Sequence, residues 1–316
     1  MKAAVVTTYG EPPHYAEIAD PQPQSPDEAV VEVLAAGLSP RVRSQANGSH
    51  YTSGGVLPLV PGVDGVGRAP DGTVRYFVLE ESPRGSMAER VVVDLRRSAV
   101  LPDGVDPVQV AAAMNPGMSS WVALRRRTVM QPGQRVMVLG ATGAAGSLAV
   151  RVARLLGAGS VVAVGRGADR MSGLGADTVV ALDGDPHTVA ESLGAAGRDV
   201  DIVLDYLWGQ PTADALTAIV PRRADDSQQL TWVQIGSVAG PVSPIPSAAL
   251  RATRLQIVGS GQGSVATRDI EAELGELGAA IATGALAVDA QAVPLAEVEA
   301  AWTDTSRPGI RLVMVP

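Results

Sequence analysis

Three glycines spaced three residues apart carry the strongest chemical signal in the sequence. Gly140, Gly143 and Gly146 follow an apolar run at residues 135–139 and open a segment of helical character. Small residues in this context let backbone N–H groups approach a pyrophosphate, and the helix N-terminus adds partial positive charge. We therefore predict a dinucleotide-binding turn, whose contacts come from Gly140, Thr142, Gly143, Ala144, Ala145 and Gly146. Glycine-rich turns also occur without ligands, and the strand-turn-helix context favours binding.

The end of the next apolar run indicates which dinucleotide this turn would take. That run ends at Val164, and Gly165, Arg166 and Arg170, which we expect to contact the cofactor, follow it. An acid at this strand end usually accepts a hydrogen bond from the ribose 2′-hydroxyl of NAD, whereas an arginine accommodates the 2′-phosphate of NADP. The nearest acid, Asp169, falls inside the following segment. The pattern predicts NADPH, and the alternative is that both arginines are ordinary surface residues.

An alternation of strands and helices must position these residues. From about residue 108 onward, we predict strands at residues 135–139, 160–164, 178–181, 200–204 and 230–235. Helical stretches fall between most of them, at residues 144–156, 169–174, 188–193 and 211–219. Such alternation is typical of an α/β fold with a doubly wound parallel sheet.

The first part of the chain has a different pattern. Short β-rich runs at residues 3–7, 28–34 and 90–93 are separated by clusters of proline and glycine. This arrangement predicts a compact β-type domain with long loops. Residues 108–124 then have helical character, and we expect the sequence Asn115-Pro116-Gly117 to break that helix.

Composition excludes several classes of function. The length of 316 residues favours two domains. A net charge of −8 argues against nucleic-acid binding, which needs clustered cations. The sequence contains no cysteine, which excludes disulfides and thiolate chemistry. No apolar run approaches the roughly 20 residues that span a bilayer. We therefore expect a cytoplasmic protein that binds neither nucleic acid nor a membrane.

These motifs together resemble the zinc-independent quinone oxidoreductase branch of the medium-chain dehydrogenase/reductase superfamily. The resemblance covers nearly the whole chain and includes a P-G-x-D-x-x-G segment at residues 61–67 and a G-x-x-A-E turn at residues 85–89. It implies a GroES-like β-rich catalytic domain at residues 1–112 and 260–316. It also implies a Rossmann NADPH-binding domain at residues 113–259, and a homodimer.

The residue types argue against a catalytic metal. Zinc enzymes of this superfamily hold their metal through cysteine and histidine. This sequence has no cysteine, and the G-H-E element of those enzymes reads Gly62-Val63-Asp64 here. Without zinc, the protein must polarise a carbonyl by hydrogen bonds or bind a substrate that accepts hydride readily.

The resemblance also implies the residues near the nicotinamide. Ser39 takes the position of a family asparagine, and Ser119 takes that of a threonine in a helix lining the site. Tyr51 matches a family tyrosine that would hydrogen-bond a carbonyl or wall the pocket. Gly236 and Ser237 resemble a segment at the nicotinamide end. The alternatives are an N-cap for either serine, a packed loop ring for Tyr51, and a surface turn at Gly236.

The sequence thus predicts an NADPH-dependent, zinc-free reductase that transfers hydride to a quinone or an α,β-unsaturated carbonyl compound. We identify no strong proton donor, which suits these substrates better than simple ketones. Two alternatives remain. One is an enoyl or alkenal reductase of a specific pathway, and the other is a non-catalytic NADPH-binding protein.

Overall fold

Two units with different kinds of sheet divide the chain. The computed structural model describes residues 1–49, 53, 55–79, 83–304, 306 and 309–316. Unit 1 comprises Met1–Asn115 and Glu271–Pro316, and unit 2 comprises Pro116–Ile270. Unit 2 is therefore continuous in sequence, whereas unit 1 is assembled from both ends of the chain.

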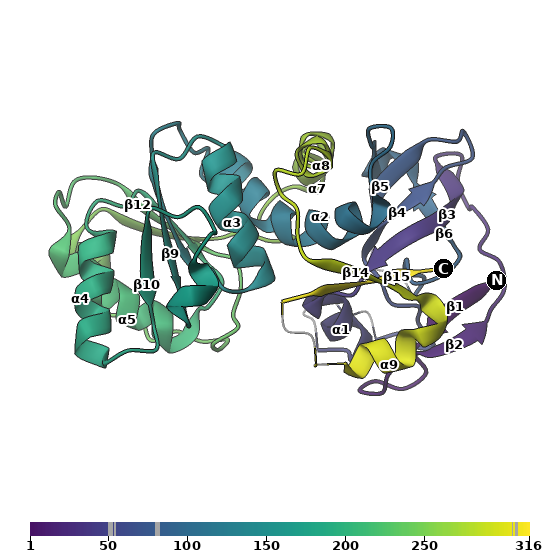
Figure 1. Cartoon of the computed structure of the whole chain (residues 1–316), viewed down its shortest axis with the longest axis horizontal. Coiled ribbons are helices and arrows are strands. Elements are labelled where there is room, and N and C mark those ends of the chain that lie inside the picture. Colours follow the sequence, from purple (N-terminus) through teal and green to yellow (C-terminus); the bar gives the residue numbers. More distant parts are fainter. Residues whose placement is uncertain (50–52, 54, 80–82, 305, 307–308) are drawn as a thin grey trace. The chain divides into compact units, whose positions relative to one another are not determined.

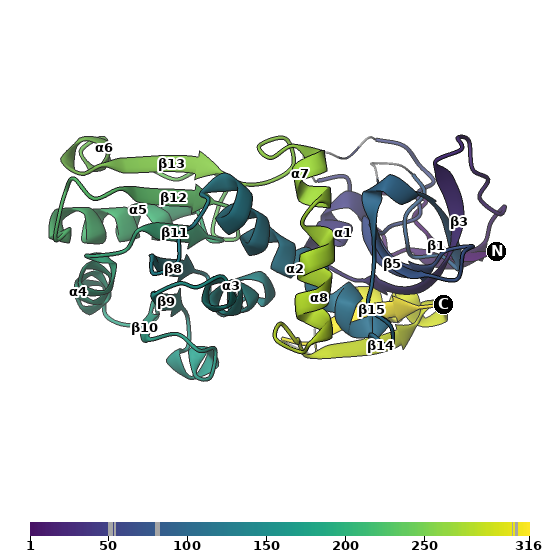
Figure 2. The ribbon, with the colours of Figure 1, turned by 90° about the horizontal axis from the view of Figure 1, so that it is seen from above.

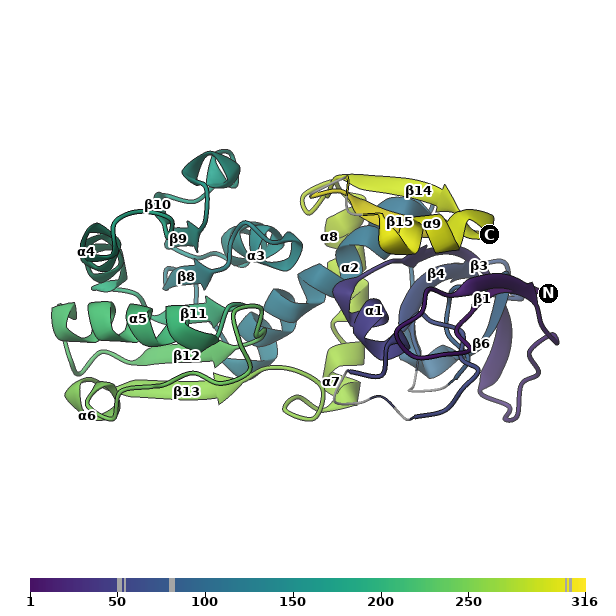
Figure 3. The ribbon, with the colours of Figure 1, turned by 90° about the horizontal axis from the view of Figure 1, so that it is seen from below.

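The sheet of unit 2 is parallel, as the alternation of strands and helices predicts. Its strand order is β10-β9-β8-β11-β12-β13, which can be followed in Figures 2 and 3. If β8 is counted first, this is the 3-2-1-4-5-6 order of dinucleotide-binding folds. The strands are β8 (Arg135–Leu139), β9 (Ser160–Gly165), β10 (Thr178–Ala181), β11 (Ile202–Asp205), β12 (Leu230–Gln234) and β13 (Leu255–Gly259).

Helices cover both faces of this sheet. Helix α3 (Ala144–Leu155) lies on one face, and α4 (Pro186–Gly197) and α5 (Gly209–Ile219) lie on the other (Figure 1). The central strand β11 is buried at every position, as expected for a strand covered on both sides. The helix expected at residues 169–174 is only a 3₁₀ turn, η3 (Ala168–Met171). Gly173 and Gly175 have positive φ just beyond it, which ends the turn. The shorter elements are η4 (Val220–Arg222) and α6 (Ala249–Ala252).

The sheet of unit 1 is mostly antiparallel. Its strand order is β14-β15-β3-β4-β5-β7, and β6 also pairs with β3. Only the β14–β15 pair is parallel within this order. The strands are β3 (Glu28–Gly37), β4 (Asp64–Arg68), β5 (Val74–Val78), β6 (Arg90–Asp94), β7 (Ser98–Val100), β14 (Ala290–Pro294) and β15 (Arg311–Val315), with a separate hairpin of β1 (Lys2–Val5) and β2 (His14–Glu17).

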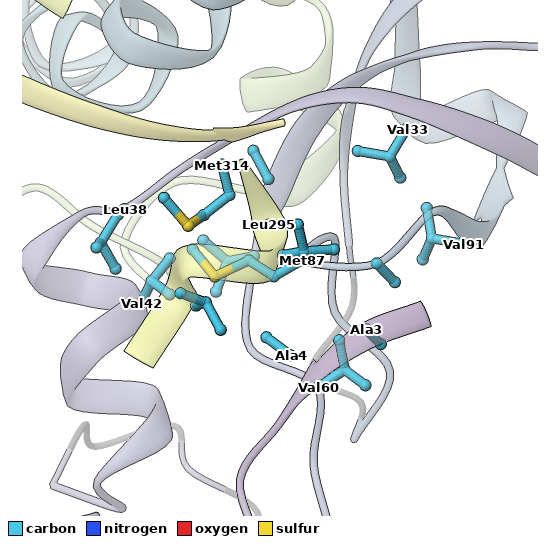
Figure 4. Close-up of a cluster of buried hydrophobic side chains, with 14 of the residues drawn as sticks. Ala3, Ala4, Val33, Leu38, Val42, Val60, Met87, Val91, Leu295 and Met314 are labelled. Carbon is cyan, nitrogen blue, oxygen red and sulfur yellow. The ribbon is translucent and has the colours of Figure 1, made fainter. Parts of the chain in front are cut away.

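Alternating side chains build the core of unit 1 (Figure 4). Val31 and Val33 of β3 are buried, as are Val91 and Val93 of the partner strand β6. Period-two burial is the signature of a sheet with one covered face. The helical elements of this unit are α1 (Pro40–Ala46), η1 (Leu95–Arg97), α8 (Leu274–Ala282), η5 (Leu295–Glu297) and α9 (Val298–Thr303), while α7 (Thr267–Glu271) spans the second boundary between the units.

Helix α2 (Pro107–Val122) continues through Pro116, so the expected break at residues 115–117 is wrong. It runs on into a π-helical turn, η2 (Ala123–Arg127). A proline at position 116 cannot donate to the carbonyl of Ala112 four residues earlier. Arg311 compensates, because its Nε lies 3.5 Å from that carbonyl oxygen and donates to it. The sequence reveals the missing donor but not the distant arginine that replaces it.

Candidate functional site

The structure explains differently why glycine occupies each of the three positions of the predicted turn. Gly140 has φ +93°, which favours glycine. A Cβ on Gly146 would lie 2.2 Å from the carbonyl oxygen of Gly140, so helix α3 can approach the turn only through a glycine. Gly143 is different, because its φ is −80° and a Cβ there would meet only the Gly140 oxygen, at 3.5 Å. Packing within the protein does not require Gly143, whereas a pyrophosphate close to the backbone would.

The turn leads directly into the N-terminus of α3. Gly143 is the N-cap, and it provides no side-chain hydrogen bond to the first turn. The N–H groups of Ala144, Ala145 and Gly146 begin the helix, where a bound anion is favoured. Gly165 supports the turn from β9, since a Cβ there would lie 3.0 Å from Cγ2 of Thr142. The residues of this turn therefore fit a dinucleotide pyrophosphate.

The two predicted arginines follow β9 at the same edge of the sheet. Arg166 and Arg170 are both exposed, and Arg170 donates to the carbonyl oxygen of Thr142 at 3.2 Å. Asp183, which the sequence alone did not bring to attention, accepts from the Gly167 N–H at 3.2 Å. Two arginines, and the acids Asp169 and Asp183, therefore lie near the position where a ribose 2′-substituent would be recognised.

Gly236 and Ser237 lie beside the residues that follow β11. A Cβ on Gly236 would be 2.8 Å from the carbonyl oxygen of Tyr206, so glycine allows a close approach of two backbones. Ser237 is exposed. Tyr206 also contacts the first glycine of the turn, since a Cβ on Gly140 would lie 3.2 Å from that of Tyr206. Tyr206, which follows β11, therefore lies between the glycine turn and the Gly236–Ser237 segment of the predicted cofactor site.

Ser119 pairs with Tyr206, a residue that sequence reasoning missed. The Ser119 Oγ lies 2.9 Å from the Tyr206 Oη, and it also donates to the carbonyl oxygen of Pro116 at 2.7 Å. Ser119 lies inside α2, so the alternative role of an N-cap is wrong for this serine. Burial raises the pKa of Tyr206 to about 12, and the phenol remains neutral at physiological pH.

Asp205 holds the segment that contains Tyr206. This carboxylate is fully buried at the end of β11 and has four donors. Oδ1 accepts from the backbone N–H groups of Leu207 and Trp208, both at 2.9 Å. Oδ2 accepts from Thr212 Oγ1 at 2.5 Å and from Trp232 Nε1 at 2.9 Å. A buried carboxylate is stable only when paired or hydrogen-bonded, and these donors satisfy it.

Trp208 adopts a backbone conformation that is almost exclusive to glycine. Its φ is 54° and its ψ is −161°. A non-glycine residue in such a region costs about 1–3 kcal/mol and persists only where its surroundings fix it. The hydrogen bond to Asp205 provides that constraint. The sequence offered one signal for this arrangement, an acid at the end of a buried strand, but nothing in it indicated a strained tryptophan.

Of the candidates in unit 1, Ser39 caps a helix. Ser39 is 4% exposed and is the N-cap of α1, where its Oγ accepts from the Val42 N–H at 3.2 Å. This is the structural role considered as its alternative. Tyr51 lies outside the described residues. Ser39 belongs to unit 1 and Ser119 to unit 2.

A buried carboxylate that sequence reasoning did not single out lies in unit 1. Asp64 accepts from the Tyr76 Oη at 2.5 Å, and the side chain of Asn115 also hydrogen-bonds to it. Burial raises the pKa of Asp64, although the Tyr76 hydrogen bond and the charges of Arg41 and Arg311 oppose the shift. Burial and the carboxylate together raise the pKa of Tyr76 well above its usual value. Asp64 is the first residue of β4, and Asn115 lies in the middle of α2.

The described residues offer neither a metal cluster nor a membrane-spanning helix. They contain no group of three or more histidine, aspartate or glutamate side chains arranged to hold a metal ion. None of the described helices combines the length and apolarity needed to cross a membrane.

A mostly antiparallel β-rich unit, combined with a parallel sheet in the dinucleotide-binding order and a glycine turn, defines a dehydrogenase or reductase fold. No family model matches the sequence. The chain is 32% identical, over the full length of both proteins, to an Emericella nidulans protein described as a probable NADPH-dependent quinone reductase. The chain belongs to the quinone oxidoreductase branch of the medium-chain dehydrogenase/reductase superfamily.

Solved structures agree with this membership. Quinone oxidoreductase from Thermus thermophilus, studied also as its complex with NADPH, is 26% identical and superposes with a TM-score of 0.79, with 100% of both chains covered. An alcohol dehydrogenase superfamily protein from Novosphingobium aromaticivorans has a TM-score of 0.82 at 24% identity, covering 100% of this chain and 99% of its own. The predicted GroES-like and Rossmann architecture is therefore confirmed.

Proposed function

We propose that this protein is an NADPH-dependent reductase whose acceptor is a quinone. The observation that carries the cofactor part of the proposal is Gly143, a glycine that packing within the protein does not require. The names of the Emericella nidulans and Thermus thermophilus proteins support the cofactor and the acceptor class. A quinone becomes a hydroquinone by taking up one hydride and one proton.

The residues of unit 2 have distinct roles in this proposal. The turn from Gly140 to Gly146 and the first N–H groups of α3 would hold the pyrophosphate. Arg166 and Arg170 would pair with the 2′-phosphate through charge-assisted hydrogen bonds. Gly236 and Ser237 would lie at the nicotinamide end. NADPH, when bound, supplies the hydride, while the protein orients the reacting groups and excludes water.

The catalytic roles suggested for Ser39, Tyr51 and Ser119 stay proposals. Ser119 donates its proton to Pro116, so we expect it to act toward a ligand as an acceptor rather than as a proton donor. Tyr51→Phe would separate the roles of that residue. A general acid would lose about 10²–10⁴ in rate, and a wall of the pocket would lose little, which is the result we expect.

The test is a screen of NADPH oxidation against quinones, enals and enones. We expect the highest kcat/KM with quinones and no loss of activity when a metal chelator is present. A preference for enals or enones would favour an alkenal reductase. Tight NADPH binding without turnover on any acceptor would contradict the proposal and favour a binding protein, and loss with a chelator that Zn²⁺ restores would contradict the metal-free chemistry. A homodimer and a cytosolic location also stay predictions, which sedimentation velocity and cell fractionation would test.

A further inference from the structure

One turn of α2, at residues 111–115, is held by contacts from other elements of unit 1. Gly37, the last residue of β3, approaches the helix so closely that a Cβ there would lie 2.6 Å from the carbonyl oxygen of Ala111. Arg311 of β15 donates through Nε to the carbonyl oxygen of Ala112 at 3.5 Å, which is long for a hydrogen bond. The end of β3 and the arginine therefore contact successive carbonyl groups of the helix.

A buried carboxylate joins the same turn of α2 to this arginine. Asp64 hydrogen-bonds to the side chain of Asn115. Burial lowers the pKa of Arg311, and the negative charge of Asp64 opposes that shift, so the two groups lie within electrostatic reach of each other. Buried ionic groups are weak evidence for stability, because apolar residues of similar volume often serve as well, and their best-attested use is to fix register. This cluster therefore indicates a role in positioning α2.

Pro116 is the weak point of the helix. A proline has no N–H, so the carbonyl of Ala112 receives no hydrogen bond from within α2, and such a proline ordinarily kinks a helix. Beyond this point the helix is held again, since Ser119 donates to the Pro116 carbonyl and lies 2.9 Å from the Tyr206 phenol. The missing bond thus falls between two anchored stretches of α2, and Arg311 supplies the donor from outside the helix.

We propose that Arg311 holds α2 continuous across Pro116 and thereby keeps Ser119 in a fixed place relative to the first half of the helix. Arg311 is then a positioning residue for the reduction, and Asp64 holds its guanidinium group in place. The catalytic part of this inference rests on the proposed function, because it needs hydride transfer to take place beside Ser119. The conformational part concerns one helix and does not depend on the reaction.

Spin labels measure the continuity of the helix directly. The sequence has no cysteine, so Gln109→Cys and Arg126→Cys place two nitroxide labels on α2 and its continuation η2 without background labelling. A straight helix separates these positions by about 25 Å. Pulsed EPR should give one narrow distance distribution for the labelled protein with no other change. Arg311→Met should broaden this distribution toward shorter distances, because a kink at Pro116 brings the two labels closer together.

A second change, Pro116→Ala, should remove the need for Arg311. Alanine restores the N–H that reaches the Ala112 carbonyl, so the double variant Arg311→Met/Pro116→Ala should recover the narrow distribution. In Arg311→Met, the kcat for 1,4-naphthoquinone should fall by up to about a hundredfold, since a misplacement of about 1 Å has a cost of that order. The double variant should recover this loss, and the Kd for NADPH should stay unchanged in both. A lowered Tm without a change in kcat would show a purely structural role and overturn the catalytic part.

Arg97→Met is the matched control, because this arginine of unit 1 also pairs through Nε, with Glu271 at 3.0 Å. It should leave the distance distribution and the kcat unchanged. An unchanged distribution in Arg311→Met overturns the inference, and so does a double variant whose distribution stays broad. Asp64→Asn removes the charge that holds the guanidinium and tests the same point if Arg311→Met does not fold. Its distribution should broaden, and a narrow one would contradict the inference.

The two kinds of measurement separate this inference from the proposed function. If the EPR distances change as expected but the protein reduces no quinone, only the proposed function fails. If the protein reduces quinones while Arg311→Met leaves both the EPR distances and the kcat unchanged, only the inference about α2 fails.

Discussion

The Ser119 hydroxyl and the Tyr206 phenol lie 2.9 Å apart within unit 2, and the direction of their hydrogen bond can be assigned. Ser119 has one proton, which it donates to the Pro116 carbonyl at 2.7 Å. Tyr206 must therefore donate to Ser119. Tyr206 is only 8% exposed, and the side chain of Ser120 is a second hydrogen-bond partner of its phenol. The pair joins the middle of α2 to the exit of β11, two elements that are 87 residues apart in sequence at this contact.

Removing the Ser119 hydroxyl alone should destabilise the protein more than removing it together with the Tyr206 hydroxyl. Ser119→Ala removes one of the two serine hydroxyls that hydrogen-bond to the buried Tyr206 phenol, which costs up to about 1–3 kcal/mol. Tyr206→Phe removes the donor as well, so the double variant should recover part of that loss. Chemical denaturation of the four proteins measures the coupling, expected at about 0.5–3 kcal/mol. Strictly additive effects would show that the two hydroxyls do not interact.

The buried tyrosines predict a loss of stability in alkali. The pKa of Tyr206 is raised to about 12, above its ordinary value of 10.0. Between these values the unfolded chain loses a proton that the folded protein keeps, so the free energy of unfolding falls as the pH rises. Tyr76 shifts in the same direction and adds to the effect. Denaturation at pH 10–12 should show the fall, and a shallower fall is expected for Tyr206→Phe. If the free energy of unfolding of Tyr206→Phe falls just as steeply with pH, the fall does not come from the Tyr206 phenol.

Replacing the second or the third glycine of the turn with alanine should affect different properties, NADPH binding for Gly143 and stability for Gly146. Gly146→Ala places a Cβ 2.2 Å from the Gly140 oxygen, so we expect it to lower the Tm through overpacking of about 1–3 kcal/mol or more. Gly143→Ala has room and a φ of −80°, so its Tm should be nearly unchanged. Its Kd for NADPH should nevertheless rise about tenfold, or about 1.4 kcal/mol, because the backbone can no longer approach the pyrophosphate. Unchanged NADPH binding in a folded Gly143→Ala protein would exclude the turn as the pyrophosphate site.

Cofactor preference should depend on the two exposed arginines. We expect the double variant Arg166→Ala/Arg170→Ala to bind NADPH at least about tenfold more weakly, since each charge-assisted hydrogen bond contributes about 1.5–3 kcal/mol. The Kd for NADH should barely change, because NADH lacks the 2′-phosphate. Arg251→Ala is a matched control, as this exposed arginine precedes β13 and lies at the amino edge of the same sheet. An unmodified protein that prefers NADH would contradict the prediction.

Local patterns were sufficient to predict the fold. The buried run at residues 135–139, the glycine turn and the alternation of strands and helices are properties of short windows, and they led to the parallel sheet that the structure contains. The structure adds the reasons for Gly140 and Gly146, a positive φ and a close approach of the helix, both of which are local to the strand-turn-helix connection.

Long-range contacts explain what could not be predicted. Nothing near Pro116 indicates that Arg311 will satisfy the carbonyl of Ala112. Tyr206 and Trp208 were overlooked for a similar reason, since their importance depends on Ser119, on a buried carboxylate and on strand neighbours distant in sequence. For Ser39, the sequence was compatible with two different roles. A serine before Pro40 suited both an N-cap and a catalytic position, and only the structure shows its hydrogen bond to Val42.

The bond between Arg311 and Ala112 has a consequence for the order in which the chain folds during synthesis. Its two partners are 199 residues apart, and all of unit 2 lies between them. The continuous unit can complete its sheet while later residues are still being made. The first 115 residues must wait with an incomplete β-sheet until β15 arrives from the ribosome. During that interval the edge of β3 that later receives β15 is exposed, and an unpaired strand edge is prone to pair with other chains.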